Sequence, residues 1–176
     1  KNPELPAEER ERIAEAVGVG AVVFNDLKSG RTNDVKFKFE EALRFDGETG
    51  PYLQFAHARL CSIERKFADL HPNPPAADPT ALTLDQEKGV LLAIARLRAA
   101  LERVADSDEP SALAQALLTL ASAVSSWLTA GNADLALRVL CPDARMAATR
   151  LTLVRAARTA LGEGLRLLGL QAPERM

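Results

Sequence analysis

The sequence has few of the residues that build metal, redox or covalent catalytic sites. Its 176 residues include two cysteines and two histidines, and no CxxC string or His-rich cluster that could bind a metal. Neither His57 nor His71 has a serine, cysteine or aspartate partner at the spacing of a catalytic motif. No His-x-x-Glu-His string, P-loop or paired-carboxylate motif occurs. We therefore expect no metal and no catalytic residue here, and we expect Cys61 and Cys141 to be reduced thiols.

Excess charge and long apolar runs are also missing. The formal net charge is -2, which argues against a general polyanion binder. No apolar run approaches the ~20 residues of a membrane span, and the start does not resemble a signal peptide. We expect a cytoplasmic protein with no membrane partner. Residues 111–176 nevertheless contain seven arginines and four carboxylates, a local basic excess that suits RNA contact and is also ordinary for a solvated surface.

Apolar residues recur mostly at helical spacing, so the predicted fold class is mainly α, a helical bundle preceded by a small mixed segment. With 47% hydrophobic and 26% charged residues, the chain is long enough for one domain with an appendage. The Gly18-Val19-Gly20 string lacks the third glycine of a dinucleotide fingerprint, so we interpret it as close packing or a helix break. The expected elements are helices at residues 8–17, 51–67, 83–105, 110–129, 132–140 and 143–168, one strand at 34–39, one or two helical turns at 40–45, and an exposed proline-rich loop at 71–80.

Some helix ends can be placed from single residues. Thr83 and Gln86 have capping-box spacing, and Gly169 is a typical C-terminal cap. The outer face of the helix at 110–129 is polar but uncharged, which fits either a contact surface or plain solvent exposure.

The helix at 51–67 organises the chain. Gly50 and Pro51 favour a helix start, because proline at the first position gives up an amide that would have no partner there. Two stripes follow at 100° per residue: an apolar one of Leu53, Ala56, Leu60, Ile63 and Phe67, and a mixed one of Tyr52, Phe55, Arg59, Ser62 and Lys66. Rings and cations together could stack on unpaired bases and neutralise phosphates. The alternative is that the rings widen the buried face and the cations are solvated.

A family resemblance favours the first interpretation. The string GPYLQFAHAR at residues 50–59 resembles the point where the catalytic part of arginyl-tRNA synthetases passes into their C-terminal anticodon-binding domain. The segments AEAVGVGAVVFNDL and RTNDVKFKFEEALRFDGETG resemble the family before this point, and RLTLVRAARTALGEGLRLLGLQAPERM resembles its terminal helix and Pro-Glu-x-Met ending. The resemblance covers both ends and most of the middle, and is weakest at residues 68–82.

The resemblance implies that residues 1–50 are the tail of a catalytic half and 51–176 a helical anticodon-binding domain. The partner would be an arginine-accepting tRNA, together with the catalytic half of the same chain, in a monomer. The implied tRNA-binding residues are Tyr52, Phe55, Arg59, Lys66, Trp127 and Met176 with its carboxylate. The family usually has tyrosine where Phe55 stands, which keeps a ring face and loses a phenolic hydrogen bond.

Catalysis would belong to the parent enzyme. The two ATP-site signatures of class I synthetases, His-x-Gly-His and a Lys-Met-Ser-Lys-Ser-like string, are absent, so we expect no cofactor in this chain and ATP with Mg in the parent ligase. This chain alone should be inactive. Two alternatives remain: the anticodon domain of another class I synthetase, and a helical protein-interaction module that binds no RNA.

Overall fold

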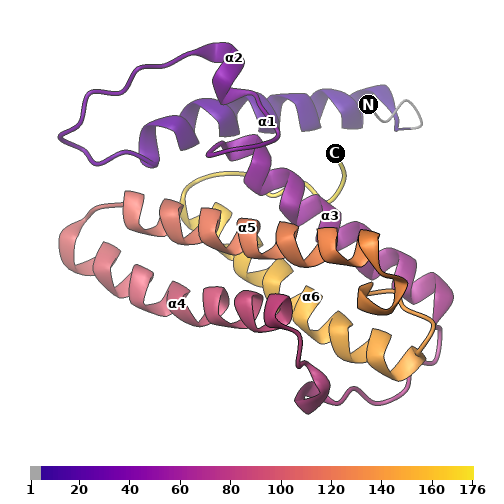
Figure 1. Cartoon of the computed structure of the whole chain (residues 1–176). Helices are drawn as coiled ribbons and strands as arrows, with labels where there is room; N and C mark the ends of the chain where they lie inside the picture. Colours follow the sequence, from indigo (N-terminus) through magenta and orange to yellow (C-terminus); the bar gives the residue numbers. More distant parts are fainter. Residues whose placement is uncertain (1–4) are drawn as a thin grey trace.

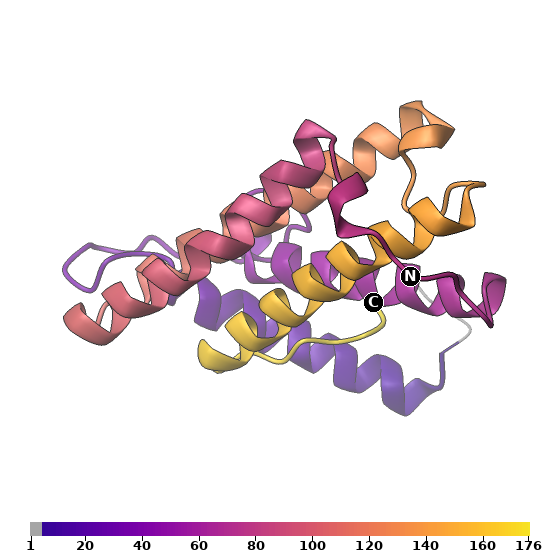
Figure 2. The ribbon, with the colours of Figure 1, turned by 90° about the horizontal axis from the view of Figure 1, so that it is seen from below.

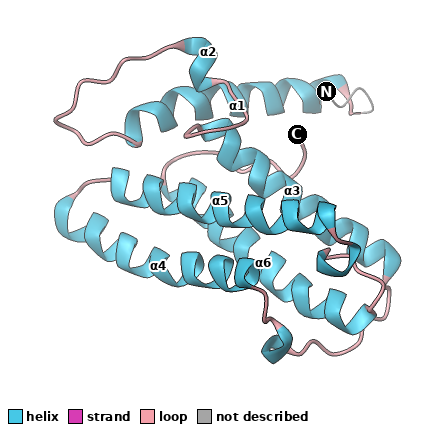
Figure 3. Cartoon of the chain, viewed as in Figure 1, coloured by secondary structure: helices cyan, strands magenta, loops and turns pink. Residues whose placement is uncertain are grey.

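The computed structural model describes residues 5–176, and all regular structure in that range is helical (Figure 3). This confirms the mainly α fold class. The helices are α1 (Ala7–Leu27), α2 (Phe39–Ala42), α3 (Gly50–Leu70), α4 (Asp85–Ser107), α5 (Ser111–Ala133) and α6 (Ala144–Leu167), with short 3-10 turns η1 (Pro79–Ala81) and η2 (Leu135–Leu137).

The helices α3, α4, α5 and α6 form the bundle, and α1 lies across one end of it (Figure 1). Helices α4 and α5 run antiparallel as a hairpin, while α3 packs mainly on α6 and on α1. The segment after α6 turns back along that helix toward α3, as Figure 2 shows from below. The apolar residues that recur at helical spacing in α5 and α6 are buried: Leu113, Leu117, Leu120, Val124 and Leu128, and Val154, Ala157, Leu161, Leu165 and Leu168.

The start of α3 follows from its sequence. Thr49 is the N-cap, with its Oγ1 accepting a hydrogen bond from the backbone N–H of Tyr52 at 3.1 Å, and proline stands in the first turn. The predicted apolar stripe faces the core: Leu53 and Leu60 are fully buried, whereas Ile63 is half-buried. The helix extends to Leu70, three residues beyond the predicted end.

The strand predicted at residues 34–39 is wrong. Residues 34–38 form an irregular loop, and Phe39 already begins α2. The whole segment from 31 to 41 is exposed, and no other strand occurs in the described range to pair with it. Alternating apolar and basic residues cannot make a strand without a partner for the backbone.

Two helix boundaries also differ from expectation. The capping residue of α4 is Leu84 and not Thr83, and it is the Glu87 carboxylate, not Gln86, that accepts from the Leu84 N–H at 3.1 Å. The helix predicted at 132–140 is wrong, because α5 continues to Ala133 and only the short turn η2 follows. Gly169 caps α6 as predicted, with φ +75°.

Helix α1 passes through the Gly18-Val19-Gly20 string without a break. A Cβ added to Gly20 would lie 2.8 Å from Nε2 of Gln54, whereas one added to Gly18 would meet nothing within 4 Å. Close packing therefore explains Gly20 but not Gly18. Phe24, also in α1, is fully buried in the same core as the bundle helices.

By length and composition, α5 could cross a membrane, contrary to the expectation that no apolar run is long enough. Half of the residues in the most apolar stretch of this helix are buried inside the protein, because α5 packs on α3, α4 and α6. Its apolar residues are thus accounted for by the bundle core.

Candidate nucleic-acid interface

Two hollows lie side by side along the mixed stripe of α3, and Arg59 lines both. The first, here the Phe55 hollow, has a volume of about 410 Å³ and is lined by Leu5, Phe55, Ala58, Arg59, Ser62, Arg65, Arg175 and Met176. The second, here the Trp127 hollow, also has a volume of about 410 Å³ and is lined by Arg59, Ser62, Ile63, Lys66, Trp127, Leu128, Gly131, Asn132 and residues 137–140. The structure thus brings five of the six predicted residues, all but Tyr52, to this surface.

Among residues 5–176, the charged side chains that line the two hollows are all cations. Arg59, Lys66 and Arg138 line the Trp127 hollow, and no Asp or Glu side chain of this range lines either one. Within residues 5–176, neither Arg59 nor Lys66 forms an ion pair or hydrogen bond. Guanidinium and ammonium groups without a carboxylate partner remain free to bind an anion.

Phe55 is the exposed ring of this surface, with 41% of its area accessible. Its ring lies edge-to-face on Phe45, with centroids 6.0 Å apart. Such a contact fixes the ring while leaving a face open. Met176 lines the Phe55 hollow from the other side, and also shares with Phe55 an apolar hollow against α1.

Trp127 lines its hollow but offers no open ring face on which a base could stack. It is 1% exposed, so its ring faces are covered by the bundle in this structure. Its Nε1 is buried and has no hydrogen-bond partner among the described residues. Almost none of the Trp127 surface is therefore open to an RNA base.

Tyr52 is separated from the other predicted residues. It is half-buried and lines a different hollow over α5, together with Asp46, Glu48 and the polar face of Gln115, Thr119 and Ser122. Burial raises the pKa of the Tyr52 phenol, opposed by a hydrogen bond with Ser125. The predicted mixed stripe is therefore split by the neighbouring elements, with Tyr52 facing α5 and an acidic loop.

Two groups of polar residues near the interface were not identified from the sequence. Gln54, His57 and Arg65 of α3 hydrogen-bond to carbonyls of residues 171–174. Glu87 and Arg150 form a buried ion pair at 2.8 Å. Glu87 precedes the buried Val90 by three residues and Arg150 precedes the buried Val154 by four, so each charge lies on the buried face of its helix. Opposite charges at such positions were the available signal.

Arg150 also shapes the interface. Its Nη1 donates to the carbonyls of Ala136 and Arg138, at 2.6 and 2.8 Å, and so holds the segment that forms one side of the Trp127 hollow. Arg138 is held in addition by its Nε, which donates to the Gly131 carbonyl at 2.9 Å.

Comparison with known proteins agrees with this geometry. The DALR anticodon binding domain matches residues 53–176, and the catalytic domain of class I (R) tRNA synthetases matches residues 1–39. Among curated proteins, the arginine–tRNA ligases of Enterococcus faecalis and Ligilactobacillus salivarius are 42% and 41% identical to this chain over its full length. The chain spans 29% of the length of each.

Solved structures give the same result. The arginyl-tRNA synthetase of Thermus thermophilus superposes with a TM-score of 0.85 at 32% identity, covering 99% of this chain and 29% of that one. The Plasmodium falciparum enzyme shares the fold, with a TM-score of 0.76 at 24% identity over 94% of this chain and 28% of its own. With more than two thirds of its residues in the matched segment, the chain belongs to the DALR anticodon binding domain family.

Proposed function

We propose that this chain is the part of an arginine–tRNA ligase that binds the anticodon loop of an arginine-accepting tRNA. The observation that carries the proposal is the pair of adjacent hollows at Arg59. Their charged side chains, among the described residues, are all cations, and an exposed phenylalanine ring borders them. Similarity to arginine–tRNA ligases over the full chain supports the same assignment.

In this mechanism the loop bases leave their stack and enter the two hollows. Phe55 offers a ring face to one base, an interaction worth about 1–3 kcal/mol. Arg59, between the hollows, and Lys66 bind the phosphates or a base edge. Trp127 and Met176 close the hollows with apolar surface. Tyr52 would contact the RNA from the neighbouring hollow over α5.

The same assignment gives the two segments of this chain different roles in the parent ligase. Residues 1–50 would be the end of the catalytic part and 51–176 the anticodon-binding domain, within a monomeric cytoplasmic enzyme. The 176 residues contain neither ATP-site signature, so ATP and Mg would be bound by the remainder of the catalytic part. This chain alone would recognise RNA without activating arginine.

The test is binding of the anticodon stem-loop of an arginine-accepting tRNA, followed by fluorescence anisotropy. We expect Phe55→Ala and Arg59→Ala each to weaken binding at least about fivefold, as for loss of one stacking or charge-assisted contact. Phe37→Ala is a matched control, because Phe37 is 46% exposed and lines neither hollow. Arg96→Ala on the exposed face of α4 is the control for charge. Tyr52→Ala should also weaken binding several-fold.

Salt dependence separates this function from a protein-interaction module. Phosphate contacts make the logarithm of affinity fall linearly with that of salt concentration, by about 0.7 per contact for a single strand. Arg59→Ala should therefore reduce the slope by about 0.7, between about 50 and 200 mM salt. No measurable RNA binding, or binding unchanged by both Phe55→Ala and Arg59→Ala, would refute the proposal.

A further inference from the structure

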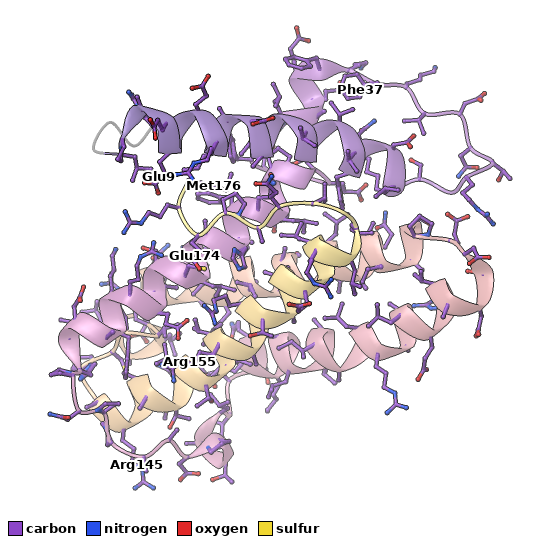
Figure 4. All side chains as sticks on the ribbon, turned by 180° about the vertical axis from the view of Figure 1, so that it is seen from behind. Glu9, Phe37, Arg145, Arg155, Glu174 and Met176 are labelled. Carbon is purple, nitrogen blue, oxygen red and sulfur yellow. The ribbon has the colours of Figure 1, made fainter. Side chains whose placement is uncertain are left out.

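The residues after α6 follow a defined path although they form no helix or strand. Gly169, in the left-handed conformation, reverses the chain, and the Leu170 N–H donates to the Leu165 carbonyl at 2.9 Å. Leu170 is buried, at 5% exposure. The following residues, 171–176, are here called the tail; they pass between α3 and α1, where Glu174 and Met176 are labelled in Figure 4.

Three side chains of α3 bind three carbonyls of the tail. Gln54 Nε2 donates to the Gln171 carbonyl at 2.9 Å, and His57 Nδ1 lies 3.0 Å from the Pro173 carbonyl. Arg65 donates through both terminal nitrogens to the Glu174 carbonyl, at 3.2 and 3.3 Å. Positions 54, 57 and 65 lie on one face of the helix. An irregular segment has no backbone partners of its own, so these donors supply them.

The first two donors are themselves fixed by burial. Gln54 is fully buried, and its Nε2 also donates to the Ala16 carbonyl of α1 at 3.0 Å. His57 is 7% exposed. Burial lowers the pKa of His57, opposed by the Pro173 hydrogen bond, and so favours the neutral form of the ring. A carbonyl only accepts, so Nδ1 carries the proton and donates to Pro173.

The hydrogen bonds from α3 to the tail fix the position of Met176. It follows the last anchored carbonyl by two residues and lines the Phe55 hollow together with Phe55 and Arg59. Without the anchors, the tail would sample many conformations and would have to be ordered when RNA binds.

We propose that Gln54, His57 and Arg65 are positioning residues for RNA recognition, which act by holding the tail so that Met176 borders the Phe55 hollow. Gln54 and His57 line neither hollow, whereas Arg65 also lines the Phe55 hollow. The proposal rests on the proposed function of this surface, and it assigns roles to three residues outside the mixed stripe.

The test compares His57→Leu, which removes the donor, with His57→Asn, whose Nδ2 can carry an N–H close to the position of Nδ1. Two measurements are made on this chain: amide hydrogen exchange of residues 171–176, and affinity for the anticodon stem-loop. We expect His57→Leu to speed exchange in the tail and to weaken binding about 5- to 10-fold, the equivalent of one net hydrogen bond. His57→Asn should restore both to within about twofold.

The same substitutions in a chain that lacks residues 173–176 show whether His57 acts through the tail. We expect His57→Leu to add no further loss there, because its acceptor is already gone. An equal loss in the shortened chain, or full affinity of His57→Leu in the complete chain, would overturn the proposal. Arg59→Ala separates the two hypotheses: if it weakens binding while His57→Leu does not, only the positioning role fails. If neither does, the proposed function fails.

Discussion

The buried ion pair between Glu87 and Arg150 is the residue-scale feature with the largest expected effect on stability. The side chains are 1% and 5% exposed, and Arg150 also donates to two backbone carbonyls. Removing one partner leaves the other charge buried without compensation. We expect Glu87→Ala to lower the free energy of unfolding by about 3–5 kcal/mol, measured by urea denaturation.

An exposed pair on the same helix provides the control. Arg98 and Glu102 form an ion pair at 2.9 Å with side chains that are 88% and 61% exposed. Glu102→Ala should change stability by about 0.5 kcal/mol or less, because water already solvates both charges. Equal effects of the two substitutions would mean that the Glu87 charge is not buried in solution.

His57 should make stability depend on pH. Burial lowers its pKa in the folded protein below the ordinary 6.5, with Arg158 adding to the shift, while the hydrogen bond to Pro173 and the nearby Glu174 oppose it. The unfolded chain therefore binds more protons between the two pKa values, and stability rises with pH in that window. The contribution is complete above about 6.5 and is lost as pH falls below that value.

Comparison of the wild type with His57→Asn isolates this contribution. We expect the free energy of unfolding of the wild type to fall more steeply between about pH 7 and pH 5 than that of the variant, because asparagine does not titrate. Parallel curves in urea denaturation at each pH would show that His57 has the same pKa in both states.

At the scale of elements, the crossing of α1 and α3 depends on Gly20. The fully buried Gln54 side chain occupies the space into which a Cβ at that position would project. We expect Gly20→Ala to destabilise the protein by about 1–3 kcal/mol, since Gln54 cannot move without losing its bonds to Ala16 and Gln171.

Gly18 is the matched control, two residues earlier in the same helix. An added Cβ there meets nothing within 4 Å, so Gly18→Ala should stabilise the chain by about 0.5–1 kcal/mol through higher helix propensity. Thermal unfolding by circular dichroism measures both variants. A loss of stability in Gly18→Ala, or none in Gly20→Ala, would contradict the packing explanation.

At the scale of the whole molecule, the N-terminal segment and the bundle share one core. Phe24 of α1 is fully buried in the cluster that also contains Trp127 of α5. We expect Phe24→Ala to lower the free energy of unfolding by about 3–5 kcal/mol and to shift the transition reported by fluorescence of Trp127, the single tryptophan.

Two probes test this cooperativity. Far-ultraviolet circular dichroism follows all helices, whereas the fluorescence reports the packing around Trp127 in the core. A single cooperative unit makes the two curves coincide. Separate transitions, or a Phe24→Ala effect seen only by circular dichroism, would show that α1 unfolds independently of the bundle.

The sequence by itself determined the features that depend on local chemistry. Helical periodicity predicted the bundle helices and the buried stripe of α3, and single residues predicted two helix ends: Pro51 at the start of α3 and Gly169 after α6. These signals lie within one or two turns of the chain, so no distant contact was needed to interpret them.

Only the tertiary structure decided what depends on a partner far along the sequence. The alternation at 34–39 made no strand because the described part of the chain has no second strand to pair with it. The mixed stripe of α3 is divided between two surfaces. Tyr52 lies against α5, whereas Arg59 lies between the tail and the η2 segment. Gln54, His57 and Glu87 acquired their roles from carbonyls and a charge at least 60 residues away, as in the contacts with Gln171, Pro173 and Arg150 at separations of 117, 116 and 63. Hydrogen bonds and ion pairs act over a few ångströms in space, and the fold alone brings such distant residues within that range.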